Sequence, residues 1–440
     1  MAKLRYQDRT AQEGPFGSST PSARVPIKPN ALAERQARRG GARRGHRGRG
    51  RRRIGPGDAE RVQRVALPDR CPDCGGALRS WGWKTRGVTD AAPVKVQKVL
   101  YRLERKRCTR CGRSWTARAP GVFPKGLYTH RLLTGAAVQH YVHGVPLGSL
   151  ERQMGIGHGS LLAALHRLAR RLEAVPERLV LEYRQAPVKH ADETGWRTDG
   201  QNGYAWLFCT PQISLFRFRK TRSTSVAREV LGPERLPGHL VVDRYGVYNK
   251  SPCALQYCYA HLLRLVTDLT KNFPGVPEVE RFVAALAPLL AEAMGLRARP
   301  LSRRAFRRRA RAIQRRMERL VHHEANHPGV QSVQDVFRQN HPRLYHWTEA
   351  PRIPAENNLA ERELRPLVIA RKISFGSQSE QGARTREILM TVLHTLKKRT
   401  PHVAAAFQSA IDQLAQNPRL DPYRLLFPHS PSKRHSPLHD

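Results

Sequence analysis

Three acidic residues lie in contexts that suit the binding of a divalent cation. Asp192 follows a short apolar run at 188–191, Asp243 follows another at 239–242, and Glu361 lies far downstream in a helical pattern. Carboxylates at strand ends of an α/β sheet lie where ligands bind, and Mg²⁺ (or Mn²⁺) prefers oxygen ligands and suits phosphate chemistry. The pattern predicts two-metal phosphoryl transfer, with Asp192 shared between the ions. The simpler alternative for either aspartate is a turn or helix cap.

The third acid has a competitor in Glu356, five residues before Glu361. In a helix the two side chains point about 140° apart, so both cannot serve one metal pair. The residues that share the face of Glu361 are Asn357, Asn358 and Arg365. They could orient the carboxylate and contact phosphate oxygens, so Glu361 is the predicted ligand and Glu356 stays an alternative. Pro366 is predicted to kink or end the helix.

Four further basic residues are candidates for supporting the site. His261 lies in Cys-Tyr-Ala-His-Leu-Leu-Arg, and Arg264 follows one turn later. His261 could assist the acids or be an ordinary core histidine, whereas Arg264 could hold phosphate or pair with an acid. Arg371 and Lys372, after the third acid, are candidate contacts to a DNA backbone.

The charge balance points to a polyanionic partner. The chain has 440 residues, which suggests two to four domains, and a net charge of +43 with a pI near 11.2. Nucleic acid, in the form of double-stranded DNA, is the predicted partner. The longest apolar run, 282–296, contains Pro288 and Glu292 and so predicts a buried helix and no membrane span. The charged N-terminus has no signal-peptide pattern, which predicts a cytoplasmic protein.

Residues 1–57 are rich in Arg, Gly, Ser and Pro and are predicted to be disordered. Arginines such as Arg43, Arg44 and Arg47 could tether nucleic acid through counterion release, which needs no fold. The alternative is a solvated flexible arm without a partner.

Residues 58–125 contain two Cys-x-x-Cys-Gly pairs. The four thiols are those of Cys71, Cys74, Cys108 and Cys111. Four thiolates in two turns predict a closed tetrahedral Zn²⁺ site in a small module, with a redox dithiol as the alternative. Alternating apolar residues around Val94–Tyr101 predict a β-ribbon between the pairs.

Residues 126–182 have a helical pattern in which a Gly-containing turn separates two helices. This predicts a helix-turn-helix-like DNA-binding region, with Ser160 as cap of the second helix. Its exposed Arg167, Arg170 and Arg171 suit phosphate contacts. A plain helical hairpin is the alternative.

The remaining chain is predicted to be a multidomain α/β structure. Strands are expected at 188–191, 203–209, 214–219 and 239–242, with a short helix at 225–231 and another at 255–269. The segment 183–270 is predicted to be the first part of the core, and 271–350 a helical insertion. The segment 351–427 is predicted to hold the rest of the core, with the third-acid helix and the C-terminal helices, and 428–440 to be a disordered tail.

The ordered motifs together resemble a known family. His-Ala-Asp-Glu-Thr-Gly-Trp, Val-Val-Asp-Arg-Tyr-Gly-Val-Tyr, Cys-Tyr-Ala-His-Leu-Leu-Arg and Asn-Asn-Leu-Ala-Glu-Arg-Glu-Leu-Arg-Pro occur in that sequence. They are similar to the DDE transposases of the bacterial insertion-sequence-66 family, TnpC type. The paired cysteines resemble that family's zinc-ribbon-like module.

The resemblance implies a ribonuclease-H-like catalytic core with a helical insertion before the third acid. It also implies Mg²⁺-dependent cutting and joining of DNA at inverted terminal repeats, by Asp192, Asp243 and Glu361. Homo-oligomers on DNA and accessory proteins are expected partners. Two alternatives stay open: a transposase-derived DNA-binding regulator without catalysis, and a ribonuclease-H-like nuclease that hydrolyses strands without joining them.

Overall fold

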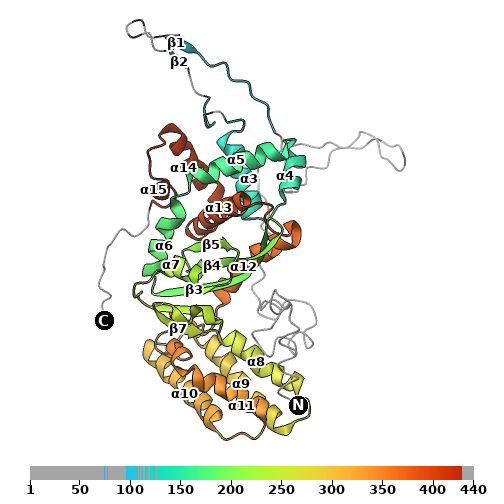
Figure 1. Ribbon diagram of the computed structural model, residues 1–440, viewed down its shortest axis with the longest axis vertical. Coiled ribbons are helices and arrows are strands. Elements are labelled where there is room, and N and C mark those ends of the chain that lie inside the picture. The colour runs from blue at the N-terminus through green and yellow to red at the C-terminus, as the bar shows by residue number, and fades with distance from the viewer. Residues whose placement is uncertain are drawn as a thin grey trace. The chain divides into compact units, whose positions relative to one another are not determined.

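A computed structural model of the protein describes residues 126–428 without a gap (Figure 1). Ahead of this stretch it describes only positions 74, 77, 96–107, 109, 111, 114–116 and 119–124. The chain divides into two compact units, and one of them, Glu34–Gln97, lies almost wholly outside the described positions. The predicted Arg/Gly arm and the tail from residue 429 also lie outside them. The described fold therefore belongs to the other unit.

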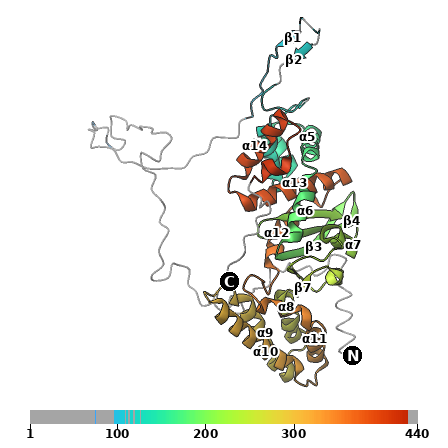
Figure 2. The ribbon, with the colours of Figure 1, turned by 90° about the vertical axis from the view of Figure 1, so that its left-hand side faces the viewer.

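A mixed five-stranded sheet with the order β5-β4-β3-β6-β7 forms the centre of this unit (Figures 1 and 2). Its strands are β3 (Val188–Thr198), β4 (Gln201–Cys209), β5 (Ser214–Arg219), β6 (His239–Val242) and β7 (Ala254–Tyr257). Strand β4 is antiparallel to β3 and β5, whereas β6 and β7 run parallel to β3. The four predicted strands and the α/β class are confirmed. Strand β7 was missed, because a short buried run cannot be told from a helix start by periodicity.

Strand β3 is longer than predicted. Its first residues pair with β6, and the whole segment from His190 to Thr198 pairs with β4. Asp199 and Gly200 close this hairpin with positive φ angles of 51° and 72°, as a two-residue hairpin turn requires. Asp192, predicted at the end of a strand, therefore lies inside β3. The strand continues past it because β4 supplies hydrogen-bond partners to polar residues that no apolar pattern marks.

Helix α13 (Glu380–Arg399) covers the edge of β5 with polar side chains. The hydroxyls of Thr391 and Thr395 accept hydrogen bonds from the backbone N–H groups of Phe216 and Ser214, at 3.0 and 3.1 Å. Glu387 accepts from the N–H of Phe218 at 3.1 Å. Side chains four residues apart on a helix thus match N–H groups two residues apart on a strand. An edge that could recruit another chain is satisfied internally.

Further helices from both ends of the described chain pack around α13. They are α3 (His130–Tyr141), α4 (Leu147–Met154), α5 (His158–Arg171), α6 (Val175–Gln185), α14 (Val403–Gln416) and α15 (Pro422–Leu426). Helices α3, α5, α6 and α14 contact α13 directly, and one continuous hydrophobic core links them to the sheet. The predicted helix-turn-helix segment is therefore built into the same core as the five-stranded sheet.

The turn between α4 and α5 differs from the prediction in one residue. Gly155 has a left-handed backbone (φ 63°) and ends α4, and α5 begins after Gly157. Ser160, predicted as the cap of α5, lies inside the helix, where its hydroxyl accepts a hydrogen bond from Tyr128. Glycine is among the preferred N-cap residues, so α5 begins after Gly157 without a side-chain cap.

The segment 271–350, predicted as a helical insertion, forms a bundle beside β7 together with the helix before it, which was predicted at 255–269 as part of the core (Figures 1 and 2). Its helices are α8 (Tyr259–Asn272), α9 (Pro277–Leu296), α10 (Arg303–His322) and α11 (Pro328–Gln339), followed by the 3₁₀ turns η4 (His341–Arg343) and η5 (His346–Thr348). The remaining elements near the sheet are α7 (Thr224–Leu231) and η3 (Gly246–Lys250). The apolar run at 282–296 lies in α9, as predicted, with Pro288 inside the helix. Within the described residues, no helix is long and apolar enough to cross a membrane.

Helix α12 (Asn358–Ser374) continues past Pro366, so the prediction that this proline ends the helix is wrong. A proline inside a helix removes one hydrogen bond and crowds the carbonyl four residues earlier. Leu364 and Leu367 on either side are buried, and α12 packs on β3 and β4. Tertiary packing thus outweighs the local preference, and the helix ends instead at Phe375, whose backbone is left-handed.

A two-stranded hairpin precedes the helices. Strand β1 (Arg105–Arg107) pairs antiparallel with β2 (Ser114–Thr116). The β-ribbon predicted around Val94–Tyr101 is wrong for the residues the structure describes there, because 96–104 form no strand. The pairing begins only where the chain approaches its second Cys-x-x-Cys turn.

Candidate active site

The register of two parallel strands carries Asp192 and Asp243 to the same edge of the sheet. His190 on β3 is aligned with Val241 on β6, where the pairing of the two strands ends. Two residues later come Asp192, within β3, and Asp243, directly after β6. Residues two apart point to the same face of a sheet, and neighbouring strands lie about 4.8 Å apart. The two aspartates therefore share one side of the sheet at adjacent positions.

Asp192 is surrounded by other carboxylates. Burial raises the pKa of Asp192 well above its usual value, and the charges of Glu193, Asp243 and Glu361 raise it further. A single hydrogen bond, from the N–H of Glu193 at 2.9 Å, acts in the opposite direction. The structure thus brings the three predicted acids within electrostatic reach of one another.

Glu361 lies in the first turn of α12 and faces His261 in the first turn of α8. Its side chain is 8% exposed, and its Oε1 atom lies 3.9 Å from Nδ1 of His261. Within the described residues, neither atom has a hydrogen-bond partner. Burial lowers the pKa of His261, although the charges of Asp243 and Glu361 oppose the shift. Two buried polar atoms thus face each other at a separation too long for a hydrogen bond.

Asn357 holds the start of α12 against the sheet. Its side-chain N–H group donates to the carbonyl of Ala191 at 2.8 Å, and its Oδ1 accepts from Nδ1 of His190 at 2.8 Å. Its backbone N–H donates to the sulfur of Cys258 at 3.1 Å. Asn357 is only 1% exposed and is the N-cap residue of α12. It therefore fixes the helix that carries Glu361 directly beside Asp192.

Replacing Asn357 by Ala is expected to destabilise the protein by about 2–4 kcal/mol, because two buried partners lose their hydrogen bonds at about 1–3 kcal/mol each. Asn358→Ala is the matched control, since the Oδ1 atom of Asn358 has no hydrogen-bond partner in this part of the chain. It should cost less than about 1 kcal/mol. Urea unfolding of both variants measures the difference, and equal losses would contradict the role given to Asn357.

Glu356, the alternative third acid, lies in a different environment. It precedes the N-cap of α12, and Nη1 of Arg297 lies 3.6 Å from its Oε1 atom. Burial raises the pKa of Glu356 to about 7. Glu361 is one of the principal charges that raise the pKa of Asp192, and Glu356 is not. Each glutamate has one buried oxygen without a hydrogen-bond partner in this part of the chain, so it is the influence on Asp192 that favours Glu361, whose role stays a prediction.

The donor set fits a hard divalent cation. Carboxylates from β3, from the residue after β6 and from α12 lie close enough together for the charges of Asp243 and Glu361 to raise the pKa of Asp192. Glu361 also leaves a buried oxygen unpaired. Mg²⁺ and Mn²⁺ prefer such oxygen ligands, whereas thiols favour softer metals. The carboxylates, and not Cys258 nearby, are therefore the expected ligands.

A buried ion pair beside the site was missed by sequence reasoning. Glu193 is 1% exposed and accepts hydrogen bonds from Arg222 at 2.6 and 2.9 Å and from Tyr248 at 2.6 Å. Arg222 also lies over the ring of Tyr245, 3.8 Å from its centroid. Burial raises the pKa of Glu193, while Arg222 and Tyr248 oppose the shift. No local signal marks a contact between a strand residue and a loop 29 positions later.

The candidate DNA contacts fall in several places. Arg167, Arg170 and Arg171 are exposed on α5, and the guanidinium of Arg171 stacks on Phe123 at 4.1 Å. Their predicted phosphate contacts stay predictions. Arg43, Arg44 and Arg47 lie outside the described residues.

The basic residues predicted near the acids also differ in their surroundings. Arg371 donates to the carbonyl of Gly195 at 2.8 Å and to Thr194, which ties α12 to β3. Lys372 and Arg365 are exposed, and Arg264 is partly buried, with its Nε atom unpaired. Lys372, Arg365 and Arg264 therefore have side-chain N–H groups available to donate to a ligand.

The structure describes two of the four predicted zinc ligands. Cys74 and Cys111 are exposed thiols, whereas Cys71 and Cys108 lie outside the described residues. The β1–β2 hairpin brackets the second Cys-x-x-Cys turn. The Zn²⁺ site stays a prediction.

A second group of potential ligands lies at the opposite end of β6. His239, His346 and Glu349 place one ligand atom each within 4.8 Å of the others. His239 begins the strand that Asp243 follows, so the group is separate from the acids. An ordinary hydrogen bond of 2.8 Å between His346 and Glu349 already accounts for much of this arrangement.

Comparisons with known proteins agree with the motifs. Residues 125–385 match the family model described as "Transposase IS66 family". The uncharacterized protein y4qI of Sinorhizobium fredii is 27% identical over 381 residues, covering 77% of this chain and 69% of that protein. The uncharacterized protein y4jD of the same organism is 25% identical over 369 residues, covering 74% of this chain and 71% of that protein. All three acids lie within the matched stretch.

Proposed function

The chain belongs to the transposase IS66 family, and from this premise we propose that it cuts and joins DNA strands at the ends of an insertion element. The proposed catalytic ligands are Asp192, Asp243 and Glu361. The observation that carries the proposal is the β3–β6 register, which aligns the first two acids, together with the unpaired Glu361 oxygen that influences Asp192.

The sheet supports a ribonuclease-H-like core. In chain order its strands are β3, β4, β5, β6 and β7, and their spatial order is third, second, first, fourth and fifth. The first three form an antiparallel meander, and the last two run parallel to the first. The acids then lie on the first strand, after the fourth strand and on a later helix, which is the arrangement that the family resemblance implies.

The side chains of the site have separable roles in this proposal. Mg²⁺ or Mn²⁺, when bound, activates the attacking oxygen and stabilises the leaving oxygen of an in-line phosphoryl displacement. Asp192, Asp243 and Glu361 hold and orient the cations. Asn357 fixes the position of Glu361, and Nδ1 of His261 lies 3.9 Å from that carboxylate, beside the proposed cation site. Arg264, Arg365 and Lys372 would contact phosphate oxygens.

The N-terminal parts would recognise DNA. In this proposal the zinc module and the α4–α5 pair bind the element ends, with α5 presenting Arg167 and Arg170. Because α5 packs on α13, and α13 covers β5, DNA held by α5 would be fixed relative to the catalytic sheet.

A strand-joining assay tests the function. Inverted repeats in the DNA that flanks the coding sequence would supply the substrate. Pre-cut ends carrying a free 3′-hydroxyl are incubated with the protein, a supercoiled plasmid and Mg²⁺. We expect ends joined to the plasmid. Nicking without joined products would indicate a nuclease, and binding without nicking would indicate a regulator, so either result would overturn the proposal.

A further inference from the structure

The positive charge of α10 is concentrated on the side turned away from the protein. The buried residues of this helix are Phe306, Ala310, Ile313, Met317 and Val321. At 3.6 residues per turn, five arginines fall within about 80° of one another on the opposite side. They are Arg304, Arg308, Arg311, Arg315 and Arg319, all exposed. We call these five residues the arginine face.

Two arginines on the flanks of α10 have partners within the protein, whereas the arginine face has none in the part of the chain that the structure describes. Arg307, on one flank, donates to the carbonyl of Glu349 at 2.9 Å, and Arg316, on the other, lies 3.8 Å from Glu292. Among the described residues, no side chain of the five outward arginines makes an ion pair or a hydrogen bond. The acid on α10, Glu318, accepts instead from Gln314 at 2.9 Å and lies 3.0 Å from His341.

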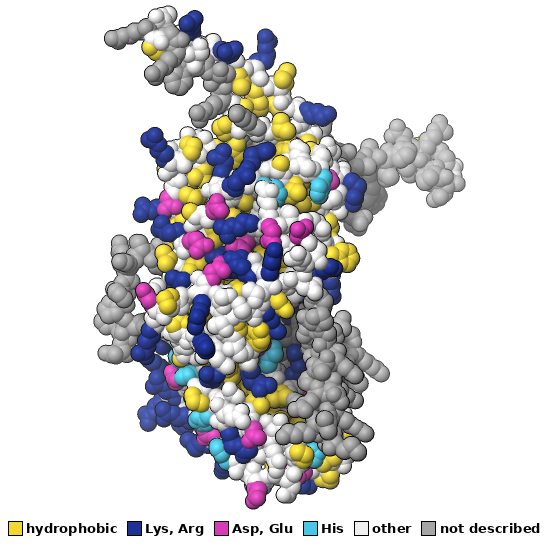
Figure 3. Space-filling view, viewed as in Figure 1, with side chains coloured by type: hydrophobic (Ala, Val, Ile, Leu, Met, Phe, Trp, Pro, Cys, Tyr) yellow, Lys and Arg dark blue, Asp and Glu magenta, His cyan; other side chains and the backbone are white. Residues whose placement is uncertain are grey.

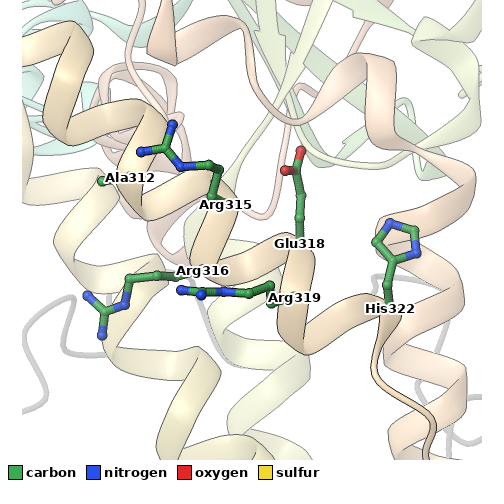
Figure 4. Close-up of a pocket in the computed structure, with 6 residues that line it drawn as sticks. All are labelled: Ala312, Arg315, Arg316, Glu318, Arg319 and His322. Atoms are coloured by element: carbon green, nitrogen blue, oxygen red, sulfur yellow. The ribbon is translucent and has the colours of Figure 1, made fainter.

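The side chains are visible as a group on the surface. Figure 3 shows dark blue side chains gathered at the lower left, over α10. Arg315, Arg316 and Arg319 line a groove on this helix with Ala312, Glu318 and His322. Figure 4 shows Arg316 and Arg319 extending in the same direction, whereas Glu318 points in a different one.

The spacing of the arginine face matches a polyanion. Arg304 and Arg319 are 15 residues apart, or about 22 Å along the axis at 1.5 Å per residue. Like charges three and four residues apart destabilise a helix unless counter-charges are supplied. Duplex DNA carries one negative charge per roughly 1.7 Å of its axis, so a row of this length can be neutralised by backbone phosphates.

We propose that the arginine face of α10 binds the phosphate backbone of duplex DNA at a place separate from the catalytic acids. Helix α10 packs on α9 and α11, and α8, which carries His261, packs on the same two helices. The arginine face therefore lies on the outer side of the bundle. That the bound polyanion is DNA rests on the proposed function, whereas the electrostatic contact itself does not depend on catalysis.

The salt dependence of DNA binding tests this contact. A triple variant, Arg308→Gln, Arg311→Gln and Arg315→Gln, is compared with the full chain on a duplex of about 40 base pairs with no element-end sequence. Each lost phosphate contact reduces the slope of log K against log salt by about 0.9, so a fall of roughly 2–3 is expected. Fluorescence anisotropy between about 50 and 200 mM KCl measures it.

Two controls separate the arginine face from net charge and from folding. Arg228→Gln, Arg281→Gln and Arg419→Gln remove the same charge from exposed, scattered positions and should change the slope by less than about 1. Lysine at positions 308, 311 and 315 should preserve it. Equal slopes for the two Gln variants, or a Lys variant as weak as the Gln variant, would overturn the proposal. So would a slope that falls on duplex RNA and not on DNA.

The chemistry gives an independent readout. The scattered control variant, which leaves both the acids and the arginine face intact, should cut element-end DNA at the wild-type rate. If wild-type protein fails to cut DNA, the proposed function is wrong. The difference in salt dependence between the variants still tests whether the arginine face contacts DNA.

Discussion

Asp192→Asn is expected to abolish DNA cleavage while DNA binding is retained. The amide cannot replace the carboxylate that the proposal places between two cations, and the other acids do not move. A loss of about a thousandfold or more is expected, which corresponds to roughly 4 kcal/mol of barrier. Nicking of supercoiled DNA in Mg²⁺ measures the rate, and anisotropy in EDTA measures binding without any metal contribution.

The same substitution has a second readout that needs no turnover. In metal-free protein, Asp192 is repelled by Glu193, Asp243 and Glu361, so the amide should raise the midpoint of thermal unfolding. Added Mg²⁺ should stabilise the wild type through preferential binding to the folded state, and the variant much less. Asp268→Asn, an acid-to-amide change on α8 at a half-exposed residue paired with Lys271, should shift the unfolding midpoint only slightly and leave its response to Mg²⁺ unchanged. Lost binding in EDTA, or retained cleavage by Asp192→Asn, would contradict the assignment.

The sequence pattern was most informative where chemistry and local structure coincide. The apolar run before Asp243 predicts β6 and its end, because a short buried strand followed by a turn is encoded locally. The position of Asp192 inside β3 could not be predicted in this way. Its strand continues through Glu193 and Thr194 only because β4 folds back against it, and a hairpin partner is not part of the local periodicity.

The support around the acids depends on contacts between distant segments. Asn357 was grouped with Glu361 on one helical face, whereas the structure makes it the N-cap that bonds to β3, 166 residues earlier in the chain. The pairing of Glu193 with Arg222 is of the same kind. Helical spacing can relate residues on one element, but only the assembled sheet relates a strand to a helix N-terminus.

Helix α13 shows why the N-terminal helices could not be separated from the core by sequence. One side of α13 supplies Glu387, Thr391 and Thr395 to the edge of β5. Thr385 is hydrogen bonded to His166 of α5 at 2.6 Å, and His394 to the carbonyl of Tyr141 at 3.0 Å. A helix that is buried along most of its length and carries polar residues throughout has no apolar stripe to reveal its two partners.

Glu361→Gln and Glu356→Gln are expected to differ by about a hundredfold or more in cleavage rate. Glu361 influences Asp192 and leaves Oε1 unpaired opposite His261, so its amide should cut about a thousandfold more slowly. Glu356 lies beside Arg297 and should lose at most about tenfold. The two variants remove the same charge five residues apart, so each serves as the control for the other in one nicking assay.

The pH dependence of stability separates the two glutamates further. Burial raises the pKa of Glu356 to about 7 from an ordinary value of 4.5. A folded-state pKa above the unfolded one stabilises the protein fully below pH 4.5, and this contribution is lost as pH rises through about 7. Between pH 4.5 and about 7, the unfolding free energy of Glu356→Gln should therefore fall less than that of the wild type. If it also abolishes cleavage while Glu361→Gln does not, the third catalytic acid is Glu356, and the start of α12 must turn toward Asp192 when DNA binds.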